Sequence, residues 1–377
     1  MKRISRILAF SLALALMFSL AACSGGSGGA APSATPTPAP EGYEIALVTD
    51  VGNIDDKSFN EGSWNGVKGF AENNGITYAY YRPSEDSTEA RVETMKDAIS
   101  KGAKVIVCPG YLFEDAVYEM QTAYPDVNFL LLDGEPHTPD YQTYETTSNT
   151  HCILYKEEQA GYLAGYAAVM DGYTKLGFLG GMAVPAVIRY GYGFVQGADA
   201  AAQELGMAAG DIEVKYWYSG VFAPSDDIKT KMDGWYTEGT EVVFACGGGI
   251  YLSCVAAAEA AGAKVIGVDV DQSAESELII TSAMKALSTS VDLALTSLYA
   301  NGGAWDADHA GQTAVLGAAE DCIGLPTAEG SWRLETYTVA EYEGLYAGLK
   351  DGTVAVDNSF DIDVPPATTV AVVDYQG

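Results

Sequence analysis

The sequence predicts an α/β protein with two similar lobes, each built on a parallel sheet. The first observation is that apolar, strand-like runs alternate with helix-like segments from residue 45 to about 299. The second is that these runs are apolar almost throughout, as in sheets with both faces covered by helices. The third is that the alternation starts afresh near residue 157. Strands separated by helices form βαβ units, and two successive sets within 377 residues predict two lobes.

The first set of elements begins just after residue 43. Strands are expected at 45–49, 76–81, 105–109 and 129–133, and helices at 58–73, 88–101 and 114–123. Gly75 and Gly102 stand where two of these helices should end, which is a common place for glycine. The first set therefore reads as a parallel sheet with its crossover helices.

The second set repeats this arrangement. Helices are expected at 157–170, 188–205, 226–235 and 252–261, and strands at 176–180, 212–218, 241–245 and 265–268. A strand at 279–282 and a helix at 286–299 follow. After residue 299 the pattern predicts only strand-like segments at 332–338 and 369–373.

The N-terminus has the composition of an export signal. Basic residues precede an apolar run at 7–20, which ends in Leu20-Ala21-Ala22-Cys23. A basic start, a short apolar core and small residues before a cut predict a secretory signal over 1–22. The ending resembles the bacterial lipobox, which implies that Cys23 becomes the lipidated first residue; an ordinary signal followed by a chance cysteine is the alternative. Residues 23–42 are rich in Gly, Ser, Pro and Thr, and predict a flexible linker.

Composition excludes several classes of partner. The chain has 20 Lys+Arg against 51 Asp+Glu and a net charge of −31, which argues against nucleic acid because phosphate binding needs a basic surface. Three scattered histidines and the cysteine spacings fit no metal template, so neither a metal nor a cofactor is expected. The remaining cysteines are expected to be small core residues: Cys108, Cys152, Cys246, Cys254 and Cys322.

The candidate ligand site follows from the strand ends. In open α/β sheets, ligands bind beyond the carboxyl ends of the strands. Asp50, Asp133 and Asp269 end expected strands, and glycine-bearing turns at 109–110 and 247–249 end two others. Carboxylates accept hydrogen bonds from sugar hydroxyls, although each of these acids could instead cap a helix. Phe59 and Asn60 begin the first helix, where an aromatic ring could stack on a base and an amide could match its edge. Phe222 lies in the corresponding loop of the second lobe and could close the opposite face. Ordinary lobe packing is the alternative for both phenylalanines.

Several ordered motifs resemble the basic membrane protein family, the PnrA-like solute-binding lipoproteins of ABC importers. They are 50–64 (DVGNIDDKSFNEGSW), 158–165 (EQAGYLAG), 177–181 (GFLGG), 267–272 (GVDVDQ) and 281–285 (TSAMK). The resemblance implies a type I periplasmic-binding-protein fold, with two Rossmann-like lobes, a ligand cleft and three hinge crossings. On that basis we expect residues 43–148 and about 272–310 in the first lobe, and residues 149–271 and about 311–377 in the second.

The resemblance also implies a purine nucleoside as ligand. Phe59 and Phe222 would sandwich the base, and Asn60 and Asp133 would read its edge; Trp217 or Tyr218 could serve in place of Phe222. The remaining site residues would surround the ribose or the cleft floor: Asp50, Gly248, Asp269 and Lys285. The implied partners are a membrane permease and its ATPase, and the protein would act as a monomer anchored through Cys23 on the outer face of the cell membrane.

Two alternatives remain open from the sequence. A lipid-anchored sensor or adhesin could use the same cleft without transport. A nucleoside hydrolase is less favoured, because Asp50, Asp55 and Asp56 resemble only part of that family's calcium-binding cluster and supply too few ligands for calcium. The sequence also shows no nucleophile set or phosphate loop, so we expect a protein that is not an enzyme.

Overall fold

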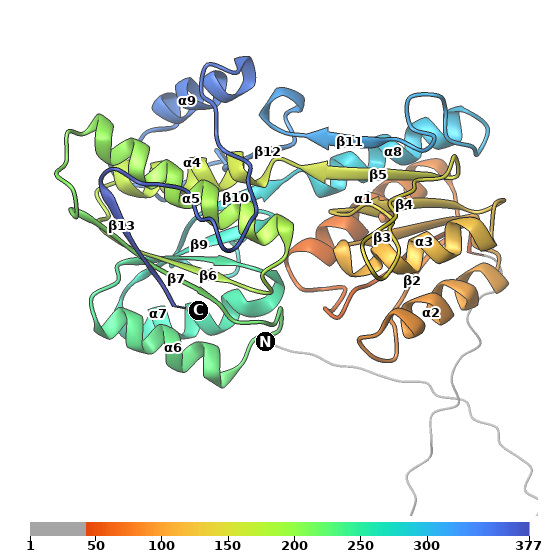
Figure 1. Ribbon diagram of the computed structural model, residues 1–377, viewed down its shortest axis with the longest axis horizontal. Coiled ribbons are helices and arrows are strands. Elements are labelled where there is room, and N and C mark those ends of the chain that lie inside the picture. The colour runs from red at the N-terminus through yellow and green to blue at the C-terminus, as the bar shows by residue number, and fades with distance from the viewer. Residues whose placement is uncertain (1–42, 377) are drawn as a thin grey trace, which may run out of the picture. The chain divides into compact units, whose positions relative to one another are not determined.

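The computed structural model describes residues 43–376, which form two lobes that each contain a parallel sheet (Figure 1). One sheet has the strand order β11-β5-β4-β3-β1-β2, and the other has the order β12-β10-β9-β8-β6-β7-β13. In the described chain these sheets are parallel except for the short β10–β12 pair. The expected α/β class with two lobes is confirmed. The signal segment 1–22, the anchor Cys23 and the linker 23–42 lie outside the described residues.

The first lobe is the six-stranded sheet with helices on both faces. Its strands are β1 (Ile45–Val48), β2 (Tyr78–Tyr81), β3 (Val105–Pro109), β4 (Asn128–Leu132), β5 (Thr150–Tyr155) and β11 (Thr313–Leu316). Its helices are α1 (Phe59–Asn74), α2 (Thr88–Ser100), η1 (Tyr111–Phe113), α3 (Glu114–Ala123) and α8 (Leu287–Ala300). Successive strand residues face opposite ways, so Leu47 packs with α1 and α8 while Val48 packs with α2 and α3.

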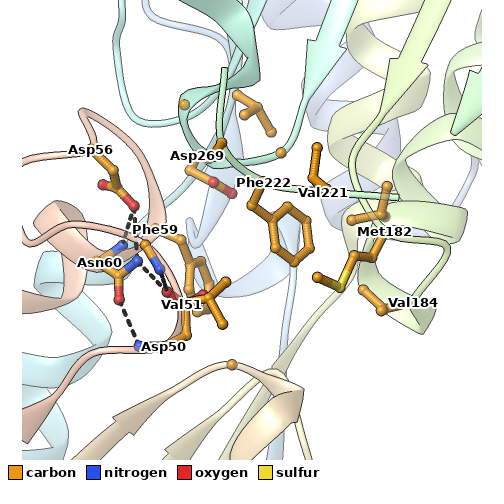
Figure 2. A pocket seen from close by; sticks show the side chains of 18 of the residues that line it. Asp50, Val51, Asp56, Phe59, Asn60, Met182, Val184, Val221, Phe222 and Asp269 are labelled. Carbon is orange, nitrogen blue, oxygen red and sulfur yellow. Dashed lines mark hydrogen bonds between the residues drawn. The ribbon is translucent and has the colours of Figure 1, made fainter. Parts of the chain in front are cut away.

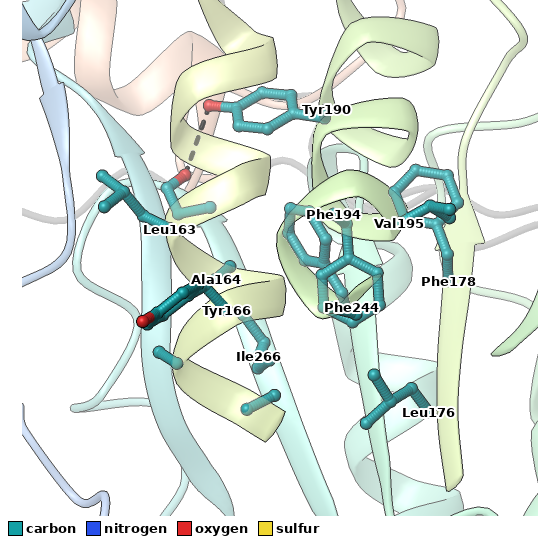
Figure 3. Packing of buried hydrophobic residues seen from close by; sticks show 14 of the residues in the cluster. Leu163, Ala164, Tyr166, Leu176, Phe178, Tyr190, Phe194, Val195, Phe244 and Ile266 are labelled. Atoms are coloured by element: carbon teal, nitrogen blue, oxygen red, sulfur yellow. Dashed lines mark hydrogen bonds between the residues drawn. The ribbon is translucent and has the colours of Figure 1, made fainter. Parts of the chain in front are cut away.

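The second lobe is the seven-stranded sheet, also covered on both faces. Its strands are β6 (Lys175–Gly180), β7 (Ile212–Tyr218), β8 (Val242–Cys246), β9 (Lys264–Asp269), β10 (Ile279–Lys285), β12 (Ile323–Gly324) and β13 (Ala371–Tyr375). Its helices are α4 (Glu157–Met170), α5 (Pro185–Glu204), α6 (Asp226–Thr237), η2 (Gly248–Ile250), α7 (Tyr251–Ala261), η3 (Ala318–Glu320) and α9 (Val339–Asp351). Helices α4 and α5 cover one face, where Phe178, Phe194 and Phe244 pack together (Figure 3), and α6 and α7 cover the other.

Helices α4 and α5 pack backbone against backbone. A Cβ atom added to Gly161 would lie 2.0 Å from the carbonyl oxygen of Tyr190, and one on Gly165 would lie 2.0 Å from that of Phe194. Only glycine permits such an approach. The glycines of the expected 158–165 motif are therefore explained by packing, and the close approach also brings the first turns of the two helices together.

The chain passes between the lobes three times, as the resemblance implies. The crossings follow β5, β10 and β11, near residues 156, 286 and 317. The sequence predicts boundaries between the lobes at 148/149, about 271/272 and about 310/311. Each crossing lies later, because β5 pairs with β4, β10 with β9, and β11 with β5, and such long-range pairing leaves no local mark in the sequence.

The last part of the chain differs most from expectation. The strand expected at 332–338 is wrong: the Trp332 ring packs against Tyr337, and its Nε1 donates to the Tyr337 carbonyl at 3.0 Å. The aromatic residues there pack onto the lobe without joining a sheet. The strand expected at 369–373 is present as β13. Three further strands and one α-helix were not predicted, and neither were the short 3-10 helices: β5, β11, β12, α9, η1, η2 and η3.

The five cysteines in the described chain are buried and form no disulfide, as expected of core residues. Across residues 43–376, no helix is both long and apolar enough to cross a membrane. The same residues contain no group of three or more His, Cys, Asp or Glu side chains placed to hold a metal ion.

Candidate functional site

A cavity of about 460 Å³ lies between the two lobes, at the carboxyl ends of the strands (Figure 2). It is lined by the segments that follow β1, β2, β3, β4, β6, β7 and β8, by the first turns of α1 and α5, and by the ends of β9 and β10. All eight residues expected at the ligand site line this one cavity: Asp50, Phe59, Asn60, Asp133, Phe222, Gly248, Asp269 and Lys285. The strand ends therefore do converge on one place, as expected for this kind of sheet.

Asp133 and Asp269 follow or end their strands in a left-handed backbone conformation. Their φ angles are 58° and 66°, a region in which Asp is among the few residues tolerated. Gly248, with φ of 52°, makes a similar turn after β8. These turns end the strands sharply and place two carboxylates and a glycine backbone at the cavity wall.

Lys285 is the central cation of the cavity. Its side chain is 1% exposed and forms ion pairs with Asp133 and with Glu157, whose Oε1 lies 3.0 Å from Nζ. Nζ also lies 5.0, 5.1 and 5.4 Å from the ring centroids of Phe59, Tyr155 and Tyr190. Although burial opposes the charge, the neighbouring carboxylates raise the pKa of Lys285 above its usual value. An ammonium has three N–H donors, so at least one remains for a ligand oxygen.

Burial also affects the acids of the cavity. It raises the pKa of Asp50 to about 6 and that of Asp269 to about 6. Burial raises the pKa of Asp133 as well, and Lys285 opposes that rise. Oδ1 of Asp133 is buried without a hydrogen-bond partner in the described chain. A buried acceptor of this kind is unfavourable when left unpaired, so it fits a site that awaits a donor.

Asn60 is committed to its neighbours. Its Nδ2 donates to Asp50 Oδ1 at 2.8 Å and to Asp56 Oδ2 at 2.9 Å, while its Oδ1 accepts from the Asp50 backbone N–H at 3.3 Å. An amide has two N–H donors, and both are used. In this conformation Asn60 orients Asp50 and has no donor left for a base edge, which the resemblance had implied as its role.

Asp56 caps the first turn of α1. Its carboxylate accepts from the backbone N–H groups of Ser58, Asn60 and Glu61 at 2.9–3.1 Å. These bonds satisfy the free donors at the helix start. The carboxylate resembling part of a calcium cluster is therefore occupied by backbone donors, while Asp55 is exposed.

Phe59 and Phe222 enter the cavity from opposite lobes. The Phe222 ring lies against two glycines: added Cβ atoms would come within 2.4 Å of it at Gly181 and 3.0 Å at Gly247. Trp217 and Tyr218, the sequence alternatives to Phe222, do not line the cavity. Tyr218 instead bonds the hydroxyl of Tyr216 at 2.7 Å.

The sequence reasoning missed an apolar wall and a set of supporting charges. Met182, Val184 and Val187 line the cavity from the second lobe. Figure 2 shows Met182 and Val184, with Val221 near Phe222. The glycine pair at 180–181, at the end of β6, could have indicated that the apolar residues directly after it line the site. Glu157 was not predicted as a supporting charge, because an acidic residue is common at the start of a helix and Glu157 begins the helix expected at 157–170.

Direct contacts join the lobes around the cavity. Ser58 Oγ donates to Asp269 Oδ2 at 2.6 Å, and Gln272 Nε2 donates to the Lys57 carbonyl at 2.8 Å. Tyr111 Oη lies 3.8 Å from the sulfur of Met182. The cavity walls thus approach each other on more than one side.

Two parallel-sheet lobes with a cavity between them define a two-lobed ligand-binding fold. A solved structure of an ABC transporter solute-binding protein from Aeropyrum pernix K1 has the same fold: its TM-score is 0.70 at 22% identity, covering 85% of this chain and 95% of that one. This similarity supports the type I periplasmic-binding-protein fold.

The chain belongs to the PnrA-like family of ABC transporter substrate-binding proteins, whose model matches residues 44–357. Basic membrane protein A1 of Borrelia garinii is 32% identical over 263 residues, covering 68% of this chain and 72% of that protein. The ABC transporter nucleoside-binding protein BmpA of Lactococcus lactis is 28% identical over 242 residues. That match covers 61% of this chain and 64% of the relative, so the chain matches slightly under two thirds of BmpA.

Proposed function

We propose that the protein captures a nucleoside, by preference a purine nucleoside, in the cavity between its lobes. The observation that carries this proposal is the meeting of two phenylalanine rings from opposite lobes with buried carboxylates and one lysine in a single cavity. The similarity to a relative named a nucleoside-binding protein supports the same ligand class.

The chemistry of the walls suits the two halves of a nucleoside. A planar base gains about 1–3 kcal/mol from stacking on an aromatic ring, which Phe59 and Phe222 can offer. Ribose hydroxyls can donate to Asp269, and an N–H group on the base edge can donate to the unpaired Oδ1 of Asp133. Lys285 can donate to a ligand oxygen. A cavity of about 460 Å³ is within the usual range for small-molecule sites.

Capture works through closure of the lobes over the ligand. A ligand that contacts Phe59 on one lobe and Phe222 on the other binds the closed arrangement better than the open one. This difference in affinity shifts the population toward the closed state. The Ser58–Asp269 hydrogen bond adds to closure and holds the Asp269 carboxylate at the cavity wall.

The ligand leaves unaltered in this proposal. Asp56 is saturated by backbone donors, and the buried Cys246 thiol at the cavity wall has a pKa raised by burial, so it is a poor nucleophile. These features support binding without chemistry. Incubation with inosine should release no free base, and release by the purified protein would contradict this part of the proposal.

The loaded protein would deliver its ligand to a membrane permease driven by an ATPase. Cys23, lipidated after removal of residues 1–22, would tether a monomer to the outer face of the cell membrane. Substitution of Cys23→Ser should release the protein into the medium, and retention of the variant on the membrane would contradict the anchor.

Thermal-shift screening against nucleosides, free bases and sugars tests the ligand class, because a ligand that binds only the native state raises its apparent stability. Purine nucleosides should raise the midpoint, whereas ribose alone should not. Asp269→Asn should abolish most of the shift. Asp271→Asn is the matched control, because Asp271 lies two residues further on and does not line this cavity. Equal shifts in both variants would contradict the site.

A further inference from the structure

A chain of charged contacts leads from the cavity to the C-terminal part of the protein. Lys285 contacts Glu157, and Glu157 Oε2 accepts from Arg189 Nε at 2.6 Å. The Arg189 guanidinium carbon lies 5.5 Å from the ring centroid of Phe360. Neither Glu157, Arg189 nor Phe360 lines the cavity. Groups that do not line the cavity are therefore linked to Lys285, the one lysine among its lining residues.

Phe360 belongs to a segment that lies along α5 and comes nearest to the start of that helix at Phe360. We call residues 357–371 the C-terminal strap. Gln196 exchanges two hydrogen bonds of 2.9 Å with the backbone of Asp357, and Tyr192 donates to the Asp361 carbonyl at 2.9 Å. Phe360 reaches Arg189, in the first turns of α5. The family match ends at residue 357, so nearly all of the strap lies beyond it.

Glu157 is held between two cations. It is fully buried at the first crossing, and Lys285 lies at the second. Burial would raise the pKa of Glu157, but Lys285 and Arg189 together lower it below its usual value. If the Arg189 charge were absent, Lys285 would be the only cation contacting Glu157 among the described residues. Lys285 would then be drawn from Asp133 toward Glu157.

We propose that Arg189, covered by Phe360 of the C-terminal strap, is a positioning residue that acts through Glu157 to keep Lys285 directed at Asp133 in the ligand cavity. The role of that cavity rests on the function proposed above. The Phe360 ring shields Arg189, whose side chain is 12% exposed, and a shielded ion pair is stronger than a hydrated one. The strap thereby controls the charge distribution of a site that it does not enter.

Several titratable groups face this chain and belong to its charge balance. Those near Lys285 are Asp133, Glu157, Asp269, Tyr155, Tyr190 and Cys246. Those near Arg189 are Glu157, Asp133 and Glu158, the last of which has a pKa raised to about 7 by burial and by Glu157. Removal of the Arg189 charge would therefore act on an already acidic cluster.

The test is a carboxyl titration of the ligand-free full-length protein, by NMR with ¹³C-labelled aspartate. Signals of Asp133 and Asp269 are assigned with Asp133→Asn and Asp269→Asn. In Arg189→Gln, the titration midpoint of Asp133 should rise by at least about 0.5 pH unit, because its counter-charge is drawn away. Arg189→Lys should restore most of the wild-type midpoint.

The strap is tested by a second pair of variants. Phe360→Ala should raise the titration midpoint of Asp133 by less than Arg189→Gln does. Phe360→Trp keeps the cation–π contact and should leave the midpoint unchanged. Ile362→Ala is the matched control, because Ile362 is similarly exposed on the strap. Unchanged Asp133 midpoints in both Arg189→Gln and Phe360→Ala would overturn the inference.

Calorimetry separates this inference from the proposed function. Arg189→Gln should weaken purine nucleoside binding about tenfold and Arg189→Lys less than threefold. Full affinity in Arg189→Gln would overturn the inference while leaving the function intact. Absence of nucleoside binding in the wild type would contradict the proposed function alone, and the carboxyl titration would still decide the role of Arg189.

Discussion

Replacement of Lys285 by methionine is the most informative perturbation of the site. Met has a similar length but no charge, so the change removes the cation and keeps much of the volume. Lys285 is the only cation within ion-pair distance of Asp133 among residues 43–376. Glu157 retains Arg189. The variant therefore leaves one buried carboxylate, that of Asp133, without a partner.

The expected loss in the free energy of unfolding follows from this one unpaired carboxylate. Breaking a buried ion pair by removing one partner costs about 3–5 kcal/mol, and the side chains of Lys285 and Asp133 are 1% and 9% exposed. We expect a loss of that size in the free energy of unfolding at pH 8. Asp133 can escape the penalty by taking up a proton, which relieves about 1.4 kcal/mol per pH unit over the range in which it titrates. The loss should therefore be clearly smaller at pH 5.5.

Urea denaturation of wild type and Lys285→Met at pH 8 and pH 5.5 measures both quantities. The double variant Lys285→Met/Asp133→Asn should recover much of the stability at pH 8, because the uncompensated charge is removed. A loss below about 1 kcal/mol at pH 8, or an equal loss at both pH values, would refute the reasoning that Asp133 depends on Lys285.

Three further predictions follow from the same geometry. Phe59→Ala should weaken nucleoside binding by about 1–3 kcal/mol in calorimetry without unfolding the protein, and full affinity would count against the stacking role. The pKa of Asp269 is raised to about 6 in the folded state against 3.8 for the ordinary group, so its contribution to stability is complete below about pH 4 and lost as the pH rises through 6. The ligand-free protein should accordingly melt at a higher temperature at pH 5 than at pH 8, and the reverse order would contradict this. Gly165→Ala should lower the free energy of unfolding by about 3 kcal/mol in urea denaturation, the upper end of the usual cost of overpacking, because its Cβ would lie 2.0 Å from the Phe194 carbonyl oxygen. Gly69→Ala in α1, with open space around it, should be neutral or stabilising, and similar effects of the two substitutions would disprove the packing argument.

The sequence was most informative where local pattern and burial agree. Strands such as β3 and β4 are buried on both faces, so all of their residues except Asn128 are apolar regardless of which way they point. Two of the strands that were not predicted are short or partly exposed, so they lack a long apolar run. Strand β12 has two residues, and β11 is partly exposed. Their place is fixed by pairing with distant strands, which a local pattern does not record.

The site shows the same division. Asp133 and Asp269 could be predicted because parallel strands bring their carboxyl ends to one edge. The use of both Asn60 amide hydrogens could not, because it depends on the exact fold of the 50–60 loop. The pairing of Glu157 with Arg189 could not be predicted either. These residues lie on α4 and α5, and the approach of the two helices depends on glycine packing. Residues at predicted strand ends therefore locate the site in the sequence. The hydrogen-bond and ion-pair partners of each side chain follow only from the three-dimensional packing.

The most direct measurement of the central claim is a crystal structure of the protein with inosine. We expect the purine ring between Phe59 and Phe222, with ribose hydroxyls bonded to Asp269 and a ligand oxygen within hydrogen-bond distance of Lys285. A nucleoside bound outside the cavity, or bound with its ring away from both phenylalanines, would contradict it.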